Sequence, residues 1–526
     1  MDLLKNKIDY AKAIISDINE GKINSLRDIE LNQFDYCKKF GLTSLPTRPF
    51  VLAQIKNPSK KVKELLSIKP TRSLSGVQVI AVMLPPFDCP GHCTYCPSSF
   101  KDRVAPQSYT GFEPSTLRAQ RLGYDPYKIV ANRITQLDAT GNNAEKIELI
   151  FQGSSFTVLP KEKQELIVKR SIDAITQKES ASIDEAKKYA QKAKRTISGI
   201  TFETRPDVCG EKEINEMLML GGTRVELGVQ NPDDEIYKKV NRGHTVEDVV
   251  TSTRLLKDSA FKVLYHLMPG LPGSNYRKDL KNFKSIFSSP NFRPDMIKFY
   301  PCLVIEGTKL YLDFKKGEFK PIDEKKAVRL LADLKEEIPK YVRIMRVNRD
   351  IPSDVIYAGV KKTNLRQMVE EELKKRGKEC QCIRCQEVGL KNRENKIVFD
   401  KPKLKTMFYD ASLGEEAFIS LESKHGLYGF VRLRKPSKPF VKGIDENTAL
   451  LRELHVYGKA LALGKHDVGS VQHKGYGELL LKEAEKVAIE KFDSNKVAII
   501  SGLGVREYYK KFGYKLQEPY MSKKLK

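Results

Sequence analysis

The chain lacks long apolar stretches, which excludes a membrane-spanning protein, and its acidic residues are fewer than its basic ones. No run approaches the roughly 18 uninterrupted apolar residues of a membrane span. The first residues, MDLLKNKIDYAKAIISDINEGK, are charged throughout and contain no signal-peptide core. No internal repeat or long low-complexity tract is present. We therefore expect a soluble cytoplasmic protein with no membrane partner, whose 526 residues form two to four globular domains.

Acidic residues are outnumbered, since 67 Asp and Glu stand against 93 Lys and Arg, for a formal net charge of +26. Such a surplus attracts polyanions, and nucleic acid is the first candidate because lysine and arginine contacts with phosphates release counterions. The alternative is a solvated lysine-rich surface, as in many thermophile proteins. A basic arm precedes residue 76, and the residues expected to contact RNA there are Lys60, Lys61, Lys63 and Arg72.

Hydropathy patterns divide the chain into four parts. Residues 1–75 are basic and show helical spacing of apolar residues. Residues 76–318 alternate short apolar runs, such as VQVIAVML and KIELIFQG, with helical patterns, which is typical of βα units around a parallel sheet. About six such units predict an incomplete (β/α)6 barrel with its chemistry at the carboxyl ends of the strands. Residues 319–400 predict a charged helical connector, and residues 401–526 a separate α+β domain, so the fold class is multidomain α/β.

A first group of cysteines follows the first predicted strand, as Cys89, Cys93 and Cys96 in CPGHCTYCP. Three thiolates cannot by themselves complete a tetrahedral structural zinc site. They can hold three irons of a 4Fe–4S cubane and leave the fourth iron open to S-adenosylmethionine. The alternative is a zinc knuckle.

A second group, in the connector, consists of Cys380, Cys382 and Cys385, and Cys302 is a plausible fourth ligand. Four sulfurs would make a closed zinc site that pins the connector to the barrel. The alternative is a second iron–sulfur cluster.

Several long motifs identify a family. The C-x3-C-x2-C spacing after strand one resembles the radical S-adenosylmethionine superfamily. The segments QSYTGFEPSTLRAQRLGYDPY, FETRPDV, ELGVQ, YHLMPGLPGS and NLRQMVEEELKKRGKECQCIRCQEVG are similar to the Elongator catalytic-subunit family, including its single-subunit archaeal form. The resemblance covers about residues 70–526.

The resemblance also implies which barrel residues line the cofactor and radical path, namely Glu203, Arg205 and Gln230. The alternative is ordinary salt bridging at a barrel mouth. The family usually carries a Gly-Gly-Thr-Phe run against the cofactor, where this chain has Gly153-Ser154-Ser155-Phe156, so that contact falls to Ser154 and Ser155.

A glycine-rich turn opens a helix in the last part of the chain, where backbone N–H groups and the helix dipole can bind a pyrophosphate. The alternative is a plain turn. The context resembles the GNAT acetyltransferase fold, which implies acetyl-CoA as a ligand. The residues expected to contact it are Gln472, Lys474, Gly475, Tyr476, Gly477 and Glu478 in the turn, and Glu453, Leu454, His455 and Val456 on the preceding strand.

The same resemblance implies three residues near the thioester. Tyr508 and Tyr509 lie on the following helix, and Tyr509 is favoured as the functional one. Lys146 matches a family lysine that reaches acetyl-CoA from the barrel side, which would place the two domains face to face.

The function implied by the family is carboxymethylation of a tRNA wobble uridine. The partners would be a tRNA anticodon stem-loop, acetyl-CoA and an electron donor, and a 5′-deoxyadenosyl radical would activate the acetyl methyl group for addition to uridine carbon-5. Two alternatives stay open: a protein lysine acetyltransferase with a structural cluster, and a tRNA-binding scaffold without turnover. A methylthiotransferase is disfavoured because a GNAT domain has no role there. A homodimer or accessory subunits are left open.

Overall fold

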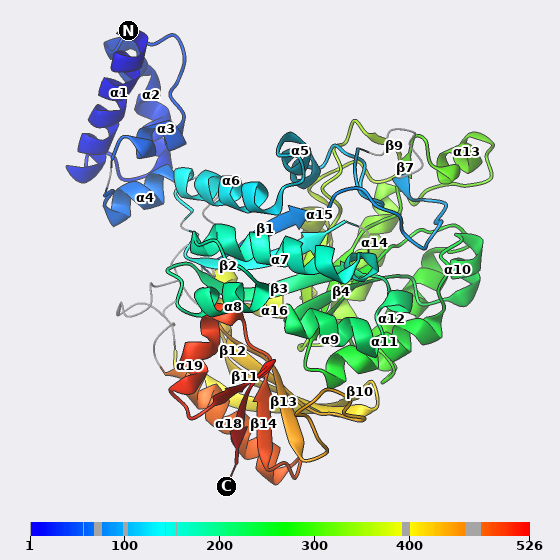
Figure 1. Ribbon diagram of the computed structural model, residues 1–526. Coiled ribbons are helices and arrows are strands. Elements are labelled where there is room, and N and C mark those ends of the chain that lie inside the picture. The colour runs from blue at the N-terminus through cyan, green and yellow to red at the C-terminus, as the bar shows by residue number, and fades with distance from the viewer. Residues whose placement is uncertain are drawn as a thin grey trace.

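The computed structural model describes residues 2–55, 57–67, 76–97, 104–142, 144–153, 155–391, 400–457 and 475–525. They form an N-terminal helical lobe, a central α/β half-barrel and a C-terminal domain below it (Figure 1). Within these ranges, no helix is both long and apolar enough to cross a membrane.

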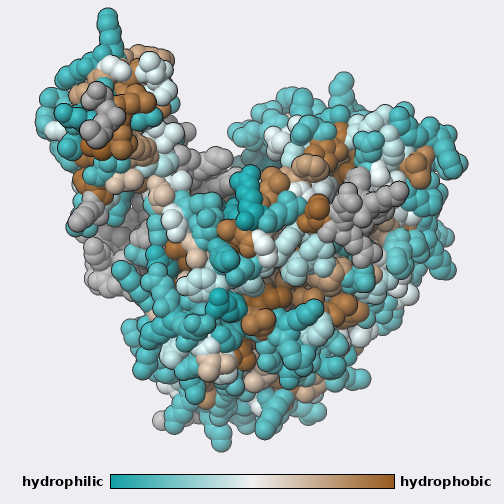
Figure 2. Space-filling view, turned by 45° about the horizontal axis from the view of Figure 1, so that its top comes forward, coloured by the Kyte–Doolittle hydropathy of each residue, from teal (hydrophilic) through white to brown (hydrophobic). Residues whose placement is uncertain are grey.

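The N-terminal lobe has a hydrophobic core of its own. Its described helices are α1 (Asp2–Asn19), α2 (Leu26–Lys39), α3 (Arg48–Ala53) and α4 (Lys60–Leu66). Ser25 begins α2 in a capping box with Asp28, in which each side chain accepts a hydrogen bond from the other's backbone N–H. Tyr10, Ile14 and Val62 are almost fully buried against one another. Figure 2 shows this lobe set apart from the body of the molecule by a notch.

The central sheet is wholly parallel and has the strand order β1-β2-β3-β4-β5-β6-β8. Its strands are β1 (Val77–Met83), β2 (Lys146–Gln152), β3 (Thr196–Thr204), β4 (Arg224–Gln230), β5 (Lys262–Leu267), β6 (Met296–Phe299) and β8 (Arg343–Val347). The barrel prediction is confirmed, with one strand more than the six units expected. The extra strand, β8, lies in the segment predicted to be helical; the short run RIMRV, which has two arginines among its five residues, becomes a strand by pairing with β6.

Helices cover the outer face of this sheet, as parallel βα units require (Figure 1). They are α5 (Pro114–Arg121), α6 (Pro126–Ala139), α7 (Lys161–Thr176), α8 (Ile183–Gln191), α9 (Glu211–Met219), α10 (Asp234–Lys239), α11 (Val246–Asp258), α12 (Tyr276–Ser288) and α14 (Glu324–Glu337). Further elements lie around the sheet: the 3₁₀ turns η3 (Phe156–Val158) and η4 (Pro206–Val208), the strand pair β7 (Val304–Ile305) and β9 (Ile356–Ala358), and the helices α13 (Lys309–Lys315), α15 (Leu365–Lys375), α16 (Ile383–Gln386) and α17 (Val388–Lys391).

The C-terminal domain is a mixed sheet with strand order β10-β11-β12-β13-β14-β16-β15. Its elements are β10 (Lys403–Ala411), β11 (Gly414–Ser423), β12 (Gly426–Lys435), β13 (Thr448–Val456), α18 (Tyr476–Glu490), β14 (Lys496–Ile499), η5 (Leu503–Val505), α19 (Arg506–Lys510), β15 (Lys515–Gln517) and β16 (Tyr520–Lys524). This confirms the α+β C-terminal domain of the expected fold class.

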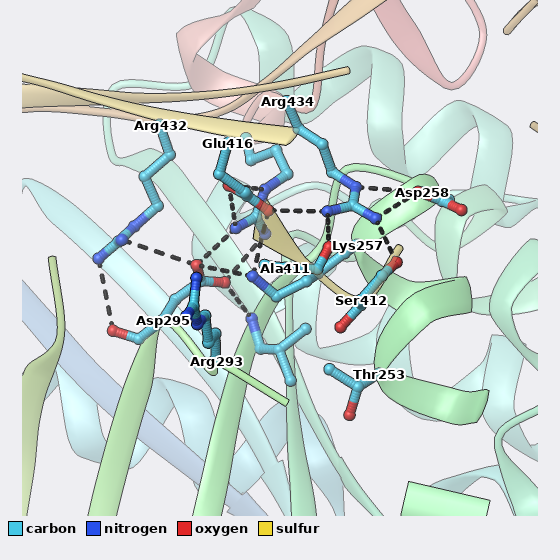
Figure 3. A network of polar contacts seen from close by, with 12 residues as sticks. Thr253, Lys257, Asp258, Arg293, Asp295, Ala411, Ser412, Glu416, Arg432 and Arg434 are labelled. Carbon is cyan, nitrogen blue, oxygen red and sulfur yellow. Dashed lines mark hydrogen bonds and ion pairs between the residues drawn. The ribbon is translucent and has the colours of Figure 1, made fainter. Parts of the chain in front are cut away.

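Buried charges join the two domains (Figure 3). Asp295, at the amino end of β6, pairs with Arg452 of the C-terminal domain. Arg452 also contacts Glu416, which in turn lies 3.1 Å from Lys257 of the barrel. Arg434 of the C-terminal domain forms an ion pair with Asp258 of the barrel at 2.6 Å. Each domain thus contributes both acidic and basic residues to the interface. The side chains of all six residues are fully buried.

Candidate active site

The first cysteine group lies at the carboxyl edge of the central sheet, in the loop after β1. The Arg242 guanidinium donates a hydrogen bond to Cys93 Sγ at 3.3 Å, and backbone N–H groups approach the other two sulfurs: Gly91 to Cys89 at 3.4 Å and Ser108 to Cys96 at 3.3 Å. Burial raises the pKa of Cys93, but the charge and hydrogen bond of Arg242, together with Arg205 and Tyr95, outweigh it, so the net pKa is lowered. Cys93 is therefore favoured as a thiolate, the form that binds iron.

The three sulfurs do not converge on a single ion. Among the described residues, the groups whose metal-binding atoms lie within 4.8 Å of one another are Cys380, Cys382 and Cys385, and Glu203, Glu226 and His266. Cys89, Cys93 and Cys96 are not such a group. A cubane presents separate irons at its corners, so ligands that surround a space rather than one point fit a cluster better than a single zinc.

A cavity of about 620 Å³ continues from these cysteines along the inner face of the sheet. The predicted site residues Ser155, Glu203, Arg205 and Gln230 all line it. It extends as far as Arg224, the first residue of β4, and therefore reaches the amino ends of the strands. The barrel thus has one continuous polar space from the cysteine loop to its opposite edge.

Buried polar atoms in this cavity are suited to a polar ligand. Within the described residues, Ser155 Oγ, Arg205 Nη1 and Gln230 Oε1 are buried without a hydrogen-bond partner. Gln230 has φ +65°, which interrupts the register of β4 against β5. Burying such groups without a partner is costly, so a bound molecule would stabilise them. These buried polar atoms fit S-adenosylmethionine beside a cluster. Ser154, which was also expected to contact it, lies outside the described residues.

The cavity also holds a charged group that the sequence analysis missed. Glu226 accepts a hydrogen bond from His266 Nε2 at 2.7 Å and another from Lys298 Nζ. Burial would raise the pKa of Glu226, but Lys298 and His266 outweigh it, so the pKa falls and the carboxylate stays ionised. Glu203 lies nearby and accepts from Tyr109 at 3.0 Å. The sequence signal that could have revealed this group is the presence of two charged residues, Arg224 and Glu226, in the largely apolar strand RVELGVQ.

His244 predicts an acid-sensitive fold. Burial lowers its pKa to about 4, with Arg242 and Arg205 adding to the effect and Asp207 opposing it. The unfolded chain takes up a proton near pH 6.5 and the folded chain does not, so this stability is full above pH 6.5 and is lost as pH falls toward 4. We expect a loss of up to ~3 kcal/mol. The urea midpoint should fall less between pH 7.5 and pH 5 in His244→Gln than in the wild type; equal falls would contradict this.

The second cysteine group is assembled, but without Cys302. Cys380, Cys382 and Cys385 lie together where Ile383 N–H donates to Val342 O, at the amino end of β8. Cys302 follows the carboxyl end of β6 and packs in a different apolar cluster with Met268. The expectation that Cys302 is the fourth ligand is therefore wrong, because the two positions lie at opposite ends of neighbouring parallel strands.

The C-terminal domain opens between two strands where acetyl-CoA was expected. Strand β14 pairs with β13 only over Thr448–Leu451, whereas β12 follows β13 as far as Val456. The predicted segment Glu453, Leu454, His455 and Val456 is thus the part of β13 that continues beyond β14. Glu453 pairs with Arg432 at 2.8 Å, and the His455 ring stacks on Phe430.

The predicted turn lies beside this opening. Gly475 precedes α18 with φ +76°, a backbone shape that favours glycine, and Tyr476, Gly477 and Glu478 form the first turn of the helix. Gln472 and Lys474 of this turn lie outside the described residues.

Of the residues expected to contact RNA, Arg72 and the side chain of Lys60 also lie outside the described residues. Lys61 donates a hydrogen bond to Asn24 at 2.6 Å, and Lys63 is exposed.

The two tyrosines differ in where their hydroxyls lie. A Cβ added to Gly477 would meet the Tyr508 hydroxyl at 2.5 Å, so Tyr508 reaches the start of α18. Burial raises its pKa to about 12. Tyr509 is buried in the domain core, with 5% of its surface exposed. The sequence argument favoured Tyr509; the structure brings Tyr508 to the predicted turn.

Lys146 lies on the side of the barrel that faces the C-terminal domain. It begins β2 and pairs in register with Thr196 of β3. Gly504 packs against that same residue, because a Cβ on Gly504 would lie 2.9 Å from Thr196. Burial lowers the pKa of Lys146. Since the cysteines lie at the other end of the strands, about 20 Å separate the two edges.

A curled parallel sheet with a three-cysteine loop at its carboxyl edge defines the class of protein as a radical S-adenosylmethionine enzyme, and residues 83–283 match the Radical SAM superfamily model. Residues 294–375 match the Radical_SAM C-terminal domain. The tRNA uridine(34) acetyltransferases of Methanocaldococcus infernus and Methanocaldococcus jannaschii are each 46% identical over 97% of this chain and cover 98% and 96% of their own. The chain belongs to the family of these enzymes and of Elongator complex protein 3, as the motifs predicted.

Two further comparisons agree. Human Elongator complex protein 3 is 39% identical over 98% of this chain and 96% of its own. The solved structure of archaeal Methanocaldococcus infernus Elp3 with an N-terminal deletion matches with a TM-score of 0.77 and 46% identity, covering 86% of this chain and 100% of its own. Membership of the radical S-adenosylmethionine class implies a 4Fe–4S cluster and S-adenosylmethionine.

Proposed function

We propose that this protein carboxymethylates the wobble uridine of tRNA, with acetyl-CoA as the source of the two-carbon group. Two relatives that are 46% identical are named for uridine 34 of tRNA. The observation that carries the finer chemistry is the cavity that connects the cysteine loop with the amino edge of the sheet. The C-terminal domain packs on that edge, where Gly502 closely approaches the backbone of Ser198 in β3. One chain thus joins a radical site and an acyl-carrier site.

When bound, the cluster and S-adenosylmethionine would supply the 5′-deoxyadenosyl radical that activates the acetyl methyl group for addition to uridine carbon-5. Cys89, Cys93 and Cys96 would hold the cluster, while Ser155, Arg205 and Gln230 would bind the polar groups of S-adenosylmethionine. An external electron donor is required. The cavity walls, which include buried Glu203 and Glu226, would keep bulk water from the radical.

The open end of β13 would bind the pantetheine arm through its backbone, and the start of α18 would bind the pyrophosphate. Water would hydrolyse the thioester, forming the carboxylate and releasing CoA as its thiol; Tyr508 would donate a hydrogen bond to the leaving sulfur, and Lys146 would approach from the barrel. Cys380, Cys382 and Cys385 would hold zinc, completed by a ligand other than Cys302.

The test is an anaerobic assay with reconstituted protein, reductant, S-adenosylmethionine, acetyl-CoA and unmodified tRNA, followed by mass spectrometry of the nucleosides. We expect 5-carboxymethyluridine. Tyr508→Phe should lower its rate about 10²- to 10⁴-fold, the range for a lost general acid. Tyr509→Phe should lower it less, because its buried ring lies in the domain core.

Two other functions make different predictions in the same assay. A protein lysine acetyltransferase would transfer acetyl groups without S-adenosylmethionine or reductant. A tRNA-binding scaffold would bind tRNA and consume no acetyl-CoA. Either result, without a modified uridine, would overturn the proposal.

A further inference from the structure

Three aromatic rings and a lysine form a cluster beside the cysteine loop, on α13 and β9, in which Tyr311 and Phe314 are half-buried. The Tyr357 ring lies 4.9 Å from Tyr311 and 5.8 Å from Phe314, both edge to face. The Lys315 ammonium lies 4.8 Å from the centre of the Tyr357 ring and donates to the Tyr357 hydroxyl at 2.7 Å. Tyr357 is nevertheless 42% exposed. We call these four residues the aromatic platform.

The platform lies next to the cavity that holds the cysteine loop, although its four residues are not among those that line the cavity. Helix α13 is tied to the cysteine loop, because Leu310 N–H donates to the carbonyl of Thr94, which lies between Cys93 and Cys96. On the other side, Ile351 lines the cavity and packs in one apolar cluster with Ile356, the residue before Tyr357. In Figure 1, α13, β7 and β9 lie together at the upper right of the half-barrel. The platform is therefore joined to the cavity wall through Ile351 and Ile356, and to the cysteine loop through Leu310.

The surroundings of the platform are suited to a phosphate backbone. Lys315, Lys316 and Lys361 are exposed. In the ranges that the structure describes, no ion pair ties Lys316 or Lys361 to an acidic side chain. The whole chain carries a net charge of +26. Aromatic rings flanked by lysines bind unpaired nucleotides, because bases stack on the rings while ammonium groups contact the phosphates.

We propose that the aromatic platform stacks an unpaired base of the anticodon loop next to the target uridine, and so presents that uridine to the cavity. The proposal rests on the proposed tRNA substrate and adds the surface that positions it. A wobble uridine must leave the stacked bases of the anticodon loop to enter a barrel. Its departure leaves the neighbouring base without a stacking partner, which has a free-energy cost. A ring next to the cavity offsets this cost by stacking the neighbouring base. Tyr357 is then a positioning residue.

The test uses the full-length protein and a synthetic anticodon stem-loop RNA that carries 2-aminopurine beside the target uridine. Stacking of 2-aminopurine on the platform should change its fluorescence when wild-type protein binds. Tyr357→Ala should weaken binding roughly 5- to 100-fold, the range for loss of a base–aromatic stack, and should abolish the fluorescence change. Tyr357→Phe keeps the ring and should retain both. Phe408→Ala, at an exposed aromatic of the C-terminal domain, is the matched control and should behave as the wild type.

The outcomes separate the two proposals. If Tyr357→Ala binds the RNA with unchanged affinity and an unchanged fluorescence response, the platform proposal is overturned and the proposed function stands. If Tyr357→Phe loses as much as Tyr357→Ala, the hydroxyl rather than the ring matters, and stacking is overturned. If wild-type protein fails to bind the RNA at all, the proposed function falls and the platform falls with it.

Discussion

Replacing Cys93 by alanine is expected to abolish both the reductive cleavage of S-adenosylmethionine and the formation of modified uridine. Cys93 is one of three thiols in the cysteine loop, and Arg242 holds its pKa below the usual value. Two thiolates leave a second corner of the cubane without a protein ligand, so the cluster would not be held. The readouts are visible absorbance and iron content after reconstitution, 5′-deoxyadenosine by chromatography, and nucleoside mass spectrometry.

Cys37→Ala is the matched control. Cys37 is buried in the N-terminal lobe, in a core separate from the barrel, so its loss should leave the cluster intact. Binding of tRNA by Cys93→Ala should persist and show that the fold is retained. Full turnover by Cys93→Ala would refute the assignment of the cluster to this loop.

Arg452→Met is expected to produce the largest loss of stability of any single replacement between the domains. Arg452 contacts both Asp295 and Glu416, and the side chains of all three are fully buried. Without the guanidinium these carboxylates keep only their other partners in the network, and removing one partner from a buried ion pair costs ~3–5 kcal/mol. Urea unfolding followed by circular dichroism should show a clearly lower midpoint.

A second interdomain pair provides the comparison. Lys340 of the barrel lies 3.5 Å from Glu422 of β11, but its side chain is 44% exposed. Exposed pairs contribute ~0–1 kcal/mol, so Lys340→Ala should shift the midpoint little. A midpoint for Arg452→Met as high as that of Lys340→Ala would show that the buried network does not stabilise the interface. Arg452→Met should also lower turnover, because Arg432 of the same buried network positions Glu453 on β13.

Local motifs were predictable because their residues lie within a few positions of one another. The spacing of Cys89, Cys93 and Cys96, and the Gly475-x-Gly477 turn, are properties of short segments, and the structure shows each in the expected setting. The alternation of apolar strands with helices predicted the parallel sheet for the same reason. These signals also carried the family resemblance, which the relatives at 46% identity confirm.

The remaining features depend on which distant segments pair. Strand β8 forms because the run RIMRV pairs with β6. Cys302 lies away from Cys380 because the carboxyl end of β6 and the amino end of β8 lie at opposite edges of the sheet. Tyr508 and Tyr509 are adjacent and chemically equal in the sequence, and only the packing of α19 against α18 sends one hydroxyl to Gly477. Thus the sequence by itself determined the type and spacing of the residues in the cysteine loop and in the glycine turn. The tertiary structure decided how the sites face one another, because burial and strand register are set by contacts between residues far apart in the chain.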